Sequence, residues 1–157
     1  MTSAPPLDVP QTDVDDLRDR LRRTRWAPAW PVTGWTAGTD QAELRRLVEY
    51  WADGFDWAAQ QSSINALPWH RAKVAGTPLS YLRFDAETPG ALPLVLTNGW
   101  PSTAIELVDL ARRLARPSEY GGEATDAFTA IIPVLPGILG AGSRGEHRSW
   151  WGNGASP

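Results

Sequence analysis

The sequence predicts an α/β protein in which a helical N-terminal region precedes a β-hairpin and a strand–helix–strand (βαβ) unit. Three observations support this class. Before residue 67, apolar residues recur at the three-and-four spacing of helices. From Trp69 to Phe84 apolar and polar residues alternate, as in a hairpin. Two continuous apolar runs, Leu92–Thr97 and Ala127–Pro133, then flank a helical pattern, and such a crossover implies a parallel pair of strands.

The first predicted helix follows the proline-rich segment Met1–Gln11. Thr12 or Asp13 can cap it, because short polar side chains accept hydrogen bonds from the first free amides of a helix. Aspartates crowd its first turn and arginines its last, which suits the helix dipole. Its predicted apolar face consists of Val14, Leu17, Leu21 and Thr24.

The next region is rich in tryptophan. Six of the nine tryptophans fall between Trp26 and Trp69. We expect the irregular loop Trp26–Gly38 to be held by packing of its rings. The alternative, a surface on which ligands or bases stack, is less favoured because no basic groove accompanies the rings.

Two further helices are predicted from capping signals. Asp40–Glu43 resembles a capping box that begins the second helix, and Asp53–Gly54 marks its end. Asp56 can cap the third helix, which Pro68 stops. The hairpin follows, with Gly76–Thr77 as its predicted turn.

Leu92–Thr97 is the run on which the prediction of function depends. It lacks polar alternation, so we expect a strand buried on both faces. Asn98–Pro101 then forms a tight turn, and Thr103–Glu106 resembles a capping box for the next helix. That helix should end near Arg116–Pro117 and bury Leu107, Leu110, Ala111 and Leu114. Ala127–Pro133 is predicted to be another buried strand, and Gly, Pro, Ser and Asn after it predict an irregular tail.

Composition narrows the function further. A chain of 157 residues can hold one domain with a real core. The absence of cysteine excludes disulfides, zinc–thiolate sites and a cysteine nucleophile, and it suits a cytoplasmic protein. The net charge of −3 without a basic block argues against nucleic-acid and membrane-surface partners. No cofactor or metal site is expected, and no apolar run approaches the length of a membrane span.

Five blocks, in order along the chain, resemble the epoxide hydrolases of the microsomal and juvenile-hormone type, a similarity that runs from about Leu17 to Gly137. The blocks are Leu17-Arg18-x-Arg20-Leu21-x-x-Thr24-Arg25-Trp26; Tyr50-Trp51 with Phe55-Asp56-Trp57; Ile64-Asn65-Ala66-Leu67-Pro68; Asn98-Gly99-Trp100-Pro101; and Pro133-Val134-Leu135-Pro136-Gly137.

The resemblance implies the incomplete front part of an α/β-hydrolase fold. Residues 1–75 would be the family's N-terminal region, residues 76–137 the first part of the hydrolase domain, and residues 138–157 an irregular tail. The chain therefore looks truncated relative to the family. In the family reaction an aspartate opens a small apolar epoxide to give an ester, a His with an acid partner activates water to cleave it, and tyrosines protonate the epoxide oxygen.

The same resemblance assigns the backbone amide of Trp100 to the oxyanion hole. Asn98, Gly99 and Pro101 would shape the turn, and Asn98 stands where the family has His. The family nucleophile belongs to a Gly-Gly-Asp-Trp-Gly-like motif, and these residues contain no such motif. The general-base His and the cap tyrosines are also missing, so the chain is expected to be inactive alone.

Other candidate sites are weak. Ser143, Glu146 and His147 could form a triad only in a Gly-rich tail that nothing holds in place. His70 is read as a surface residue of a strand. Gly137, Gly140 and Gly142 have the wrong order for a dinucleotide-binding loop. The alternative function is a non-catalytic interaction module that associates, through Leu92–Thr97, with a chain carrying the rest of the sheet.

Overall fold

The computed structural model describes residues 7–28, 31–32 and 34–134, and the chain divides into two compact units. Residues 8–62 form one unit, and Leu7 with residues 63–134 belongs to the other. The predicted irregular tail, from Leu135 onward, lies outside the described residues. Among the residues described, no helix is long and apolar enough to cross a membrane.

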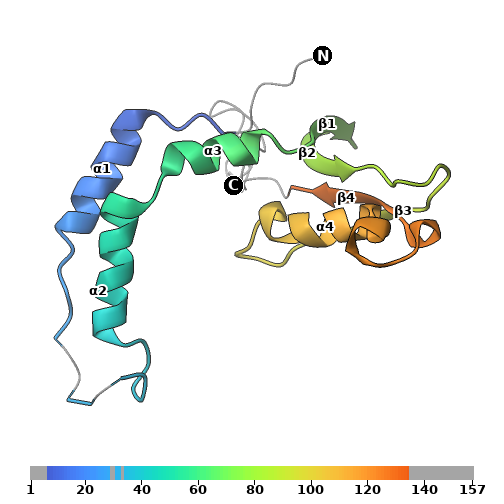
Figure 1. Ribbon diagram of the computed structural model, residues 1–157. Helices are drawn as coiled ribbons and strands as arrows, with labels where there is room; N and C mark the ends of the chain where they lie inside the picture. Colours follow the sequence, from blue (N-terminus) through green and yellow to red (C-terminus); the bar gives the residue numbers. More distant parts are fainter. Residues whose placement is uncertain (1–6, 29–30, 33, 135–157) are drawn as a thin grey trace, which may run out of the picture. The chain divides into compact units, whose positions relative to one another are not determined.

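The unit of residues 8–62 is helical (Figure 1). Helix α1 spans Gln11–Arg22, α2 spans Gln41–Glu49 and continues into a π-helical turn over Tyr50–Gly54, and α3 spans Trp57–Asn65, running on into the other unit. The π-helical turn contacts both α1 and α2. Arg22 at the end of α1 donates a 2.7 Å hydrogen bond to Asp53 in this turn, so an ion pair joins the two segments.

The capping predictions hold for two of the three helices. Asp40 accepts a hydrogen bond from the Glu43 amide, and Asp56 accepts one from the Ala59 amide, each at 3.0 Å. The predicted cap of α1 by Thr12 or Asp13 is wrong. Pro10 is the N-cap, and its carbonyl accepts from the amides of residues 13 and 14 at 3.0 and 3.3 Å. The helix therefore begins earlier, because Pro10 has the extended backbone that suits an N-cap.

The predicted packing of the tryptophan rings is only partly correct. Trp26 lies under the guanidinium of Arg45, whose Cζ is 4.4 Å from the ring centroid. Trp35, however, is 65% exposed. Trp35 lies in a turn in which the Gly38 amide donates a hydrogen bond to the Trp35 carbonyl. This backbone bond, rather than the ring, holds the turn.

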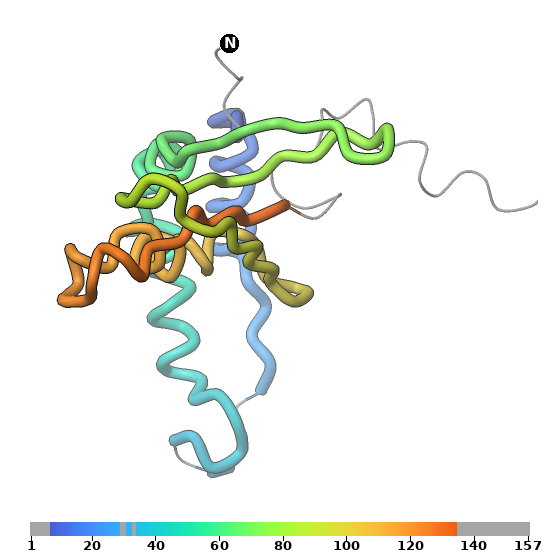
Figure 2. The backbone as a smooth tube through the Cα atoms, turned by 90° about the vertical axis from the view of Figure 1, so that its right-hand side faces the viewer, coloured from blue at the N-terminus to red at the C-terminus, as the bar shows by residue number. Residues whose placement is uncertain are grey.

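The second unit contains a four-stranded sheet in the order β1-β2-β4-β3. Strand β1 spans Trp69–Val74, β2 Thr77–Phe84, β3 Pro93–Val95 and β4 Thr129–Pro133. The predicted hairpin and the parallel pair, β3 with β4, are confirmed. In Figure 2 the β1–β2 hairpin is the long green stretch of backbone that turns and runs back alongside itself. Its turn is Ala75–Gly76 rather than Gly76–Thr77, because Thr77 already pairs with Val74. Both turn residues have positive φ, 49° and 86°, as tight hairpin turns require.

Helix α4 (Val108–Ala115) covers one face of this sheet after a 3₁₀ turn over Ala104–Leu107 (Figure 1). Leu82 of β2 and Ile132 of β4 lie opposite each other, and both are fully buried. The predicted apolar face of the helix is correct at Ala111 and wrong at Leu110, which is 45% exposed. Small residues instead form the buried stripe, which lets the helix pack close to the strands: Ala104, Val108, Ala111 and Ala115.

The prediction that Leu92–Thr97 is buried on both faces is wrong. Strand β3 is short and lies at the edge of the sheet, with Leu92 70% exposed and Val95 59% exposed. Its pairing extends slightly beyond the strand, since the Leu96 amide donates to the Ile131 carbonyl at 2.9 Å. An apolar run predicts a buried strand, but it does not show where in the sheet that strand lies. In this sheet β4 lies between β2 and β3, and β3 is an edge strand.

Candidate functional site

The candidate site is the corner Asn98–Pro101, where the chain leaves the sheet. Strand β3 is held by β4 up to the Leu96 amide, and the chain turns at residues 100 and 101 before the 3₁₀ turn and α4. Thr103 accepts a hydrogen bond from the Ile105 amide at 3.3 Å, which caps the start of this helical segment. The predicted strand, turn and helix are therefore present in this order, and the Trp100–Pro101 peptide bond is cis.

Three hydrogen bonds close the corner. The half-buried Asn98 donates from Nδ2 to the Ser102 carbonyl at 2.8 Å and to the Gly99 carbonyl at 3.1 Å. The Ser102 amide also donates to the Gly99 carbonyl, at 2.9 Å. Asn98 therefore joins both sides of the turn. It does so at the position where the resembled family has His.

Trp100 lies at the tip of the corner and is 85% exposed. Within residues 7–28, 31–32 and 34–134, no hydrogen bond joins the Trp100 amide to an acceptor. The neighbouring Gly99 is also open, since a Cβ added there would meet no heavy atom within 4 Å. The corner thus presents a backbone donor on an accessible surface, and such a donor can stabilise a developing negative charge.

The other predicted candidates do not assemble a second site. His70 is exposed on β1 and stacks on Tyr81 of β2, with ring centroids 5.3 Å apart. Ser143, Glu146, His147 and the glycines from Gly137 to Gly142 lie outside the described residues. In the part of the chain that the structure describes, no three His, Asp or Glu side chains come together as metal ligands would.

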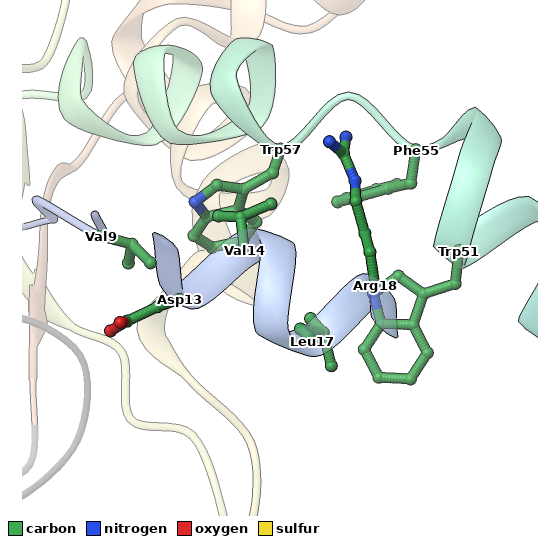
Figure 3. Close-up of a pocket in the computed structure, with 8 residues that line it drawn as sticks. All are labelled: Val9, Asp13, Val14, Leu17, Arg18, Trp51, Phe55 and Trp57. Atoms are coloured by element: carbon green, nitrogen blue, oxygen red, sulfur yellow. The ribbon is translucent and has the colours of Figure 1, made fainter. Parts of the chain in front are cut away.

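The helical unit contains a cavity of about 280 Å³ that no sequence motif indicates (Figure 3). Its walls are mostly apolar and come from α1 with the segment before it, the π-helical turn with the segment after it, and the start of α3. The indole N–H of Trp57 at this cavity is buried and has no acceptor among the described residues. The spacing of Val14, Leu17 and Arg18 on one side of α1 is the signal that could have found it. The lining residues are Val9, Asp13, Val14, Leu17, Arg18, Trp51, Phe55 and Trp57.

One carboxylate of the sheet unit has a shifted pKa. Ser118 donates to Glu87 from its hydroxyl and, at 2.9 Å, from its backbone amide. These two bonds, the side-chain bond first, hold the pKa of Glu87 below its ordinary value. The Glu87 amide donates to the Ala115 carbonyl at the end of α4. Glu87 therefore fastens its loop to α4 through its backbone and to the following turn through its carboxylate, rather than serving the corner.

Comparisons with known proteins agree with the fold and with the motif blocks. Residues 3–107 match a family described as "Epoxide hydrolase N terminus". The chain is 37% identical over 144 residues to a putative epoxide hydrolase from Stigmatella aurantiaca, covering 92% of the chain and 32% of that protein. It is 27% identical to epoxide hydrolase 1 of Oryctolagus cuniculus, covering 83% and 30%.

A solved structure shares the fold. The structure of the juvenile hormone epoxide hydrolase from Bombyx mori superposes with a TM-score of 0.65 at 23% identity, over 83% of this chain and 34% of that one. The chain therefore spans about a third of the length of the relatives that it matches.

Proposed function

Since the chain belongs to the epoxide hydrolase family, we propose that it supplies the front part of an enzyme that hydrolyses epoxides to diols. The observation that carries this proposal is the Trp100 amide, which donates to no acceptor among the described residues and belongs to an 85% exposed residue in the turn that follows β3. The remaining two-thirds of the family's length would supply the reacting side chains.

The chemistry gives this amide one task. A carboxylate opens the epoxide and becomes an ester, and water then attacks the ester carbonyl to form a tetrahedral oxyanion. The Trp100 N–H donates to that oxyanion, while Asn98, Gly99 and Pro101 shape the turn that presents it. A donor of this kind typically contributes about 10²- to 10³-fold in rate.

We further propose that these 157 residues alone do not turn over epoxide. Their sequence has no Gly-Gly-Asp-Trp-Gly-like motif, and the exposed His70 faces Tyr81 rather than the corner. The substrate of the complete enzyme would be a small apolar epoxide. A cytoplasmic location belongs to the same proposal and rests on the cysteine-free sequence.

The domain assignment is also part of the proposal. Residues 1–75 would form the N-terminal region, residues 76–137 the first part of the hydrolase domain, and residues 138–157 a tail. The matched family region ends at residue 107, beyond the β1–β2 hairpin and the corner. The family match thus crosses the proposed boundary at residue 75 and includes Trp100.

A hybrid enzyme tests the function. Residues 8–134 replace the matching third of the Stigmatella aurantiaca relative, and diol formation from styrene oxide is measured for the hybrid and for the 157-residue chain. We expect turnover by the hybrid and none above buffer by the chain. Turnover by the isolated chain that is lost on substituting one of its own residues would contradict the proposal. A folded hybrid without activity would contradict it as well.

The exposed edge of β3 favours a second candidate function, an interaction module that pairs with a separate chain carrying the rest of the sheet. Exposed apolar edges promote association, and Val95 is 59% exposed there. We expect Val95→Lys to abolish binding to the relative's remaining two-thirds in light scattering. Val74→Lys is the matched control, because Val74 is 56% exposed on the opposite edge strand. A compact monomer that binds no such fragment would refute this candidate.

A further inference from the structure

We infer that Asn98 is the positioning residue of the corner: its side-chain amide clamps two carbonyls and thereby fixes the direction of the Trp100 N–H. The inference rests on the proposed function only for the use of that N–H in catalysis. The clamp itself is a property of this chain, given by the bonds from Nδ2 to the Gly99 and Ser102 carbonyls at 3.1 and 2.8 Å.

The chemistry of the amide group explains why one nitrogen suffices. Nδ2 of asparagine carries two hydrogens, so it can donate to both carbonyls at once. The orientation of the side chain follows from the same contacts, because its oxygen in that place would face two carbonyl oxygens. A carboxylate offers no donor, and each nitrogen of an imidazole offers at most one hydrogen. Neither group reproduces the clamp from a single atom.

The geometry of the peptide bond converts this clamp into a direction. The Gly99 carbonyl and the Trp100 N–H belong to the same planar trans peptide unit, so they point in opposite directions. The carbonyl accepts from Asn98 and, at 2.9 Å, from the Ser102 amide, both within the turn. Holding the carbonyl toward the interior of the turn therefore holds the Trp100 N–H away from it.

The side chains around the corner do not fix the orientation of the Gly99–Trp100 peptide plane, so the hydrogen bonds must do so. Gly99 has no side chain that could fix the peptide plane, and a Cβ there would touch nothing within 4 Å. Trp100 is 85% exposed, so packing of this residue does not fix the plane either. Among the described residues, the hydrogen bonds to the Gly99 carbonyl come from Asn98 and Ser102, so the side chain of Asn98 supplies one of the two restraints on the plane.

Residual dipolar couplings of the 157-residue chain, labelled with ¹⁵N and ¹³C, test the inference. The Trp100 N–H coupling reports the direction of that bond relative to the amides of β2 and β4. In the unsubstituted chain it should fit one fixed direction, with through-hydrogen-bond couplings from Asn98 Nδ2 to the Gly99 and Ser102 carbonyl carbons. Asn98→Asp should abolish those couplings and reduce the Trp100 dipolar coupling, while β4 keeps its values. Asn98→His should restore it in part, through one donor.

Asn65→Asp is the matched control, because Asn65 Nδ2 also donates to a carbonyl, that of Leu7 at 2.9 Å, in a different part of the unit. It should leave the Trp100 coupling unchanged. An unchanged Trp100 coupling in Asn98→Asp overturns the inference. If that variant does not fold, the through-hydrogen-bond couplings of the unsubstituted chain decide: their presence supports the clamp and their absence overturns it. An inactive hybrid with an intact clamp would refute the proposed function alone.

Discussion

The two units of the chain are stabilised in different ways. In the sheet unit, aliphatic side chains from β2, β4 and α4 form a core in which Leu82, Ala111 and Ile132 are fully buried. Among the described residues 8–62, by contrast, Val14 and Ala52 are the buried apolar residues, and the apolar side of α2 is open. Leu44 is 40% exposed and Leu47 is 49% exposed.

The sheet unit holds its own hydrogen-bond ladder and core, so it can keep the corner at Asn98–Pro101 in place without help from residues 8–62. The helical unit relies more on caps and on exposed ion pairs such as Arg22–Asp53, which individually contribute little. We therefore expect substitutions to cost most in the sheet core and progressively less toward the surface.

The largest effect is expected for Leu82→Ala. Removing this fully buried side chain should lower the free energy of unfolding by about 2–5 kcal/mol, because it leaves a cavity against α4. Urea denaturation followed by circular dichroism measures it. Leu92→Ala is the matched control, since Leu92 is 70% exposed and its loss should change stability by less than about 0.5 kcal/mol. Equal costs for both would refute the distinction between core and edge.

Overpacking the stripe of small residues should cost somewhat less. Ala111 is fully buried between α4 and the sheet, so Ala111→Leu should destabilise the unit by about 1–3 kcal/mol. The same denaturation experiment applies, with Leu110→Ala as the control because Leu110 is 45% exposed on the same helix. A stabilised Ala111→Leu variant would show that the helix does not pack close to the strands.

In the helical unit, the cap of α2 is a sensitive point. Asp40→Ala removes the acceptor of the Glu43 amide and should cost about 0.5–2 kcal/mol, seen as a loss of helical signal at a lower urea concentration. Asp40→Asn keeps an acceptor oxygen and should be nearly neutral. If both variants behaved alike, the hydrogen bond would not be what begins this helix.

The smallest effect concerns pH. The pKa of Glu87 is lowered from its ordinary value of 4.5 by the two bonds from Ser118. A lowered folded-state pKa means that this contribution to stability is complete above pH 4.5 and is lost as the pH falls through the folded value. Ser118→Ala should therefore raise the pKa of Glu87, measured by ¹³C NMR of its carboxyl group. An unchanged titration midpoint would contradict the assigned cause.

Local signals predicted much of this fold. Asp40 and Asp56 were identifiable as caps because a cap depends on residues three positions away. The hairpin was identifiable from its alternation, with an error of one residue at Ala75–Gly76. The parallel pairing of β3 with β4 followed from the crossover through α4. In each case the determining contacts are close in sequence or follow from chirality and connection length.

The failures have a common cause. Leu92–Thr97 and Ala127–Pro133 are equally apolar, but only the position between β2 and β3 makes β4 central. The helical spacing predicts that Leu110 is buried, but the buried residues of α4 include Ala111 and Ala115 instead. At the candidate site, the resemblance predicts a role for Trp100, but the sequence does not reveal that Asn98 bridges two carbonyls. Such features depend on which elements meet in space.

The central claim is that the Trp100 amide stabilises negative charge during ester hydrolysis, and replacing the Gly99–Trp100 amide by an ester in the hybrid enzyme tests it most directly. This change removes the N–H and keeps the side chain. We expect kcat for styrene oxide to fall about 10²- to 10³-fold, while Trp100→Phe, which retains the N–H, stays close to the parent hybrid. A folded ester variant with unchanged kcat would contradict the claim.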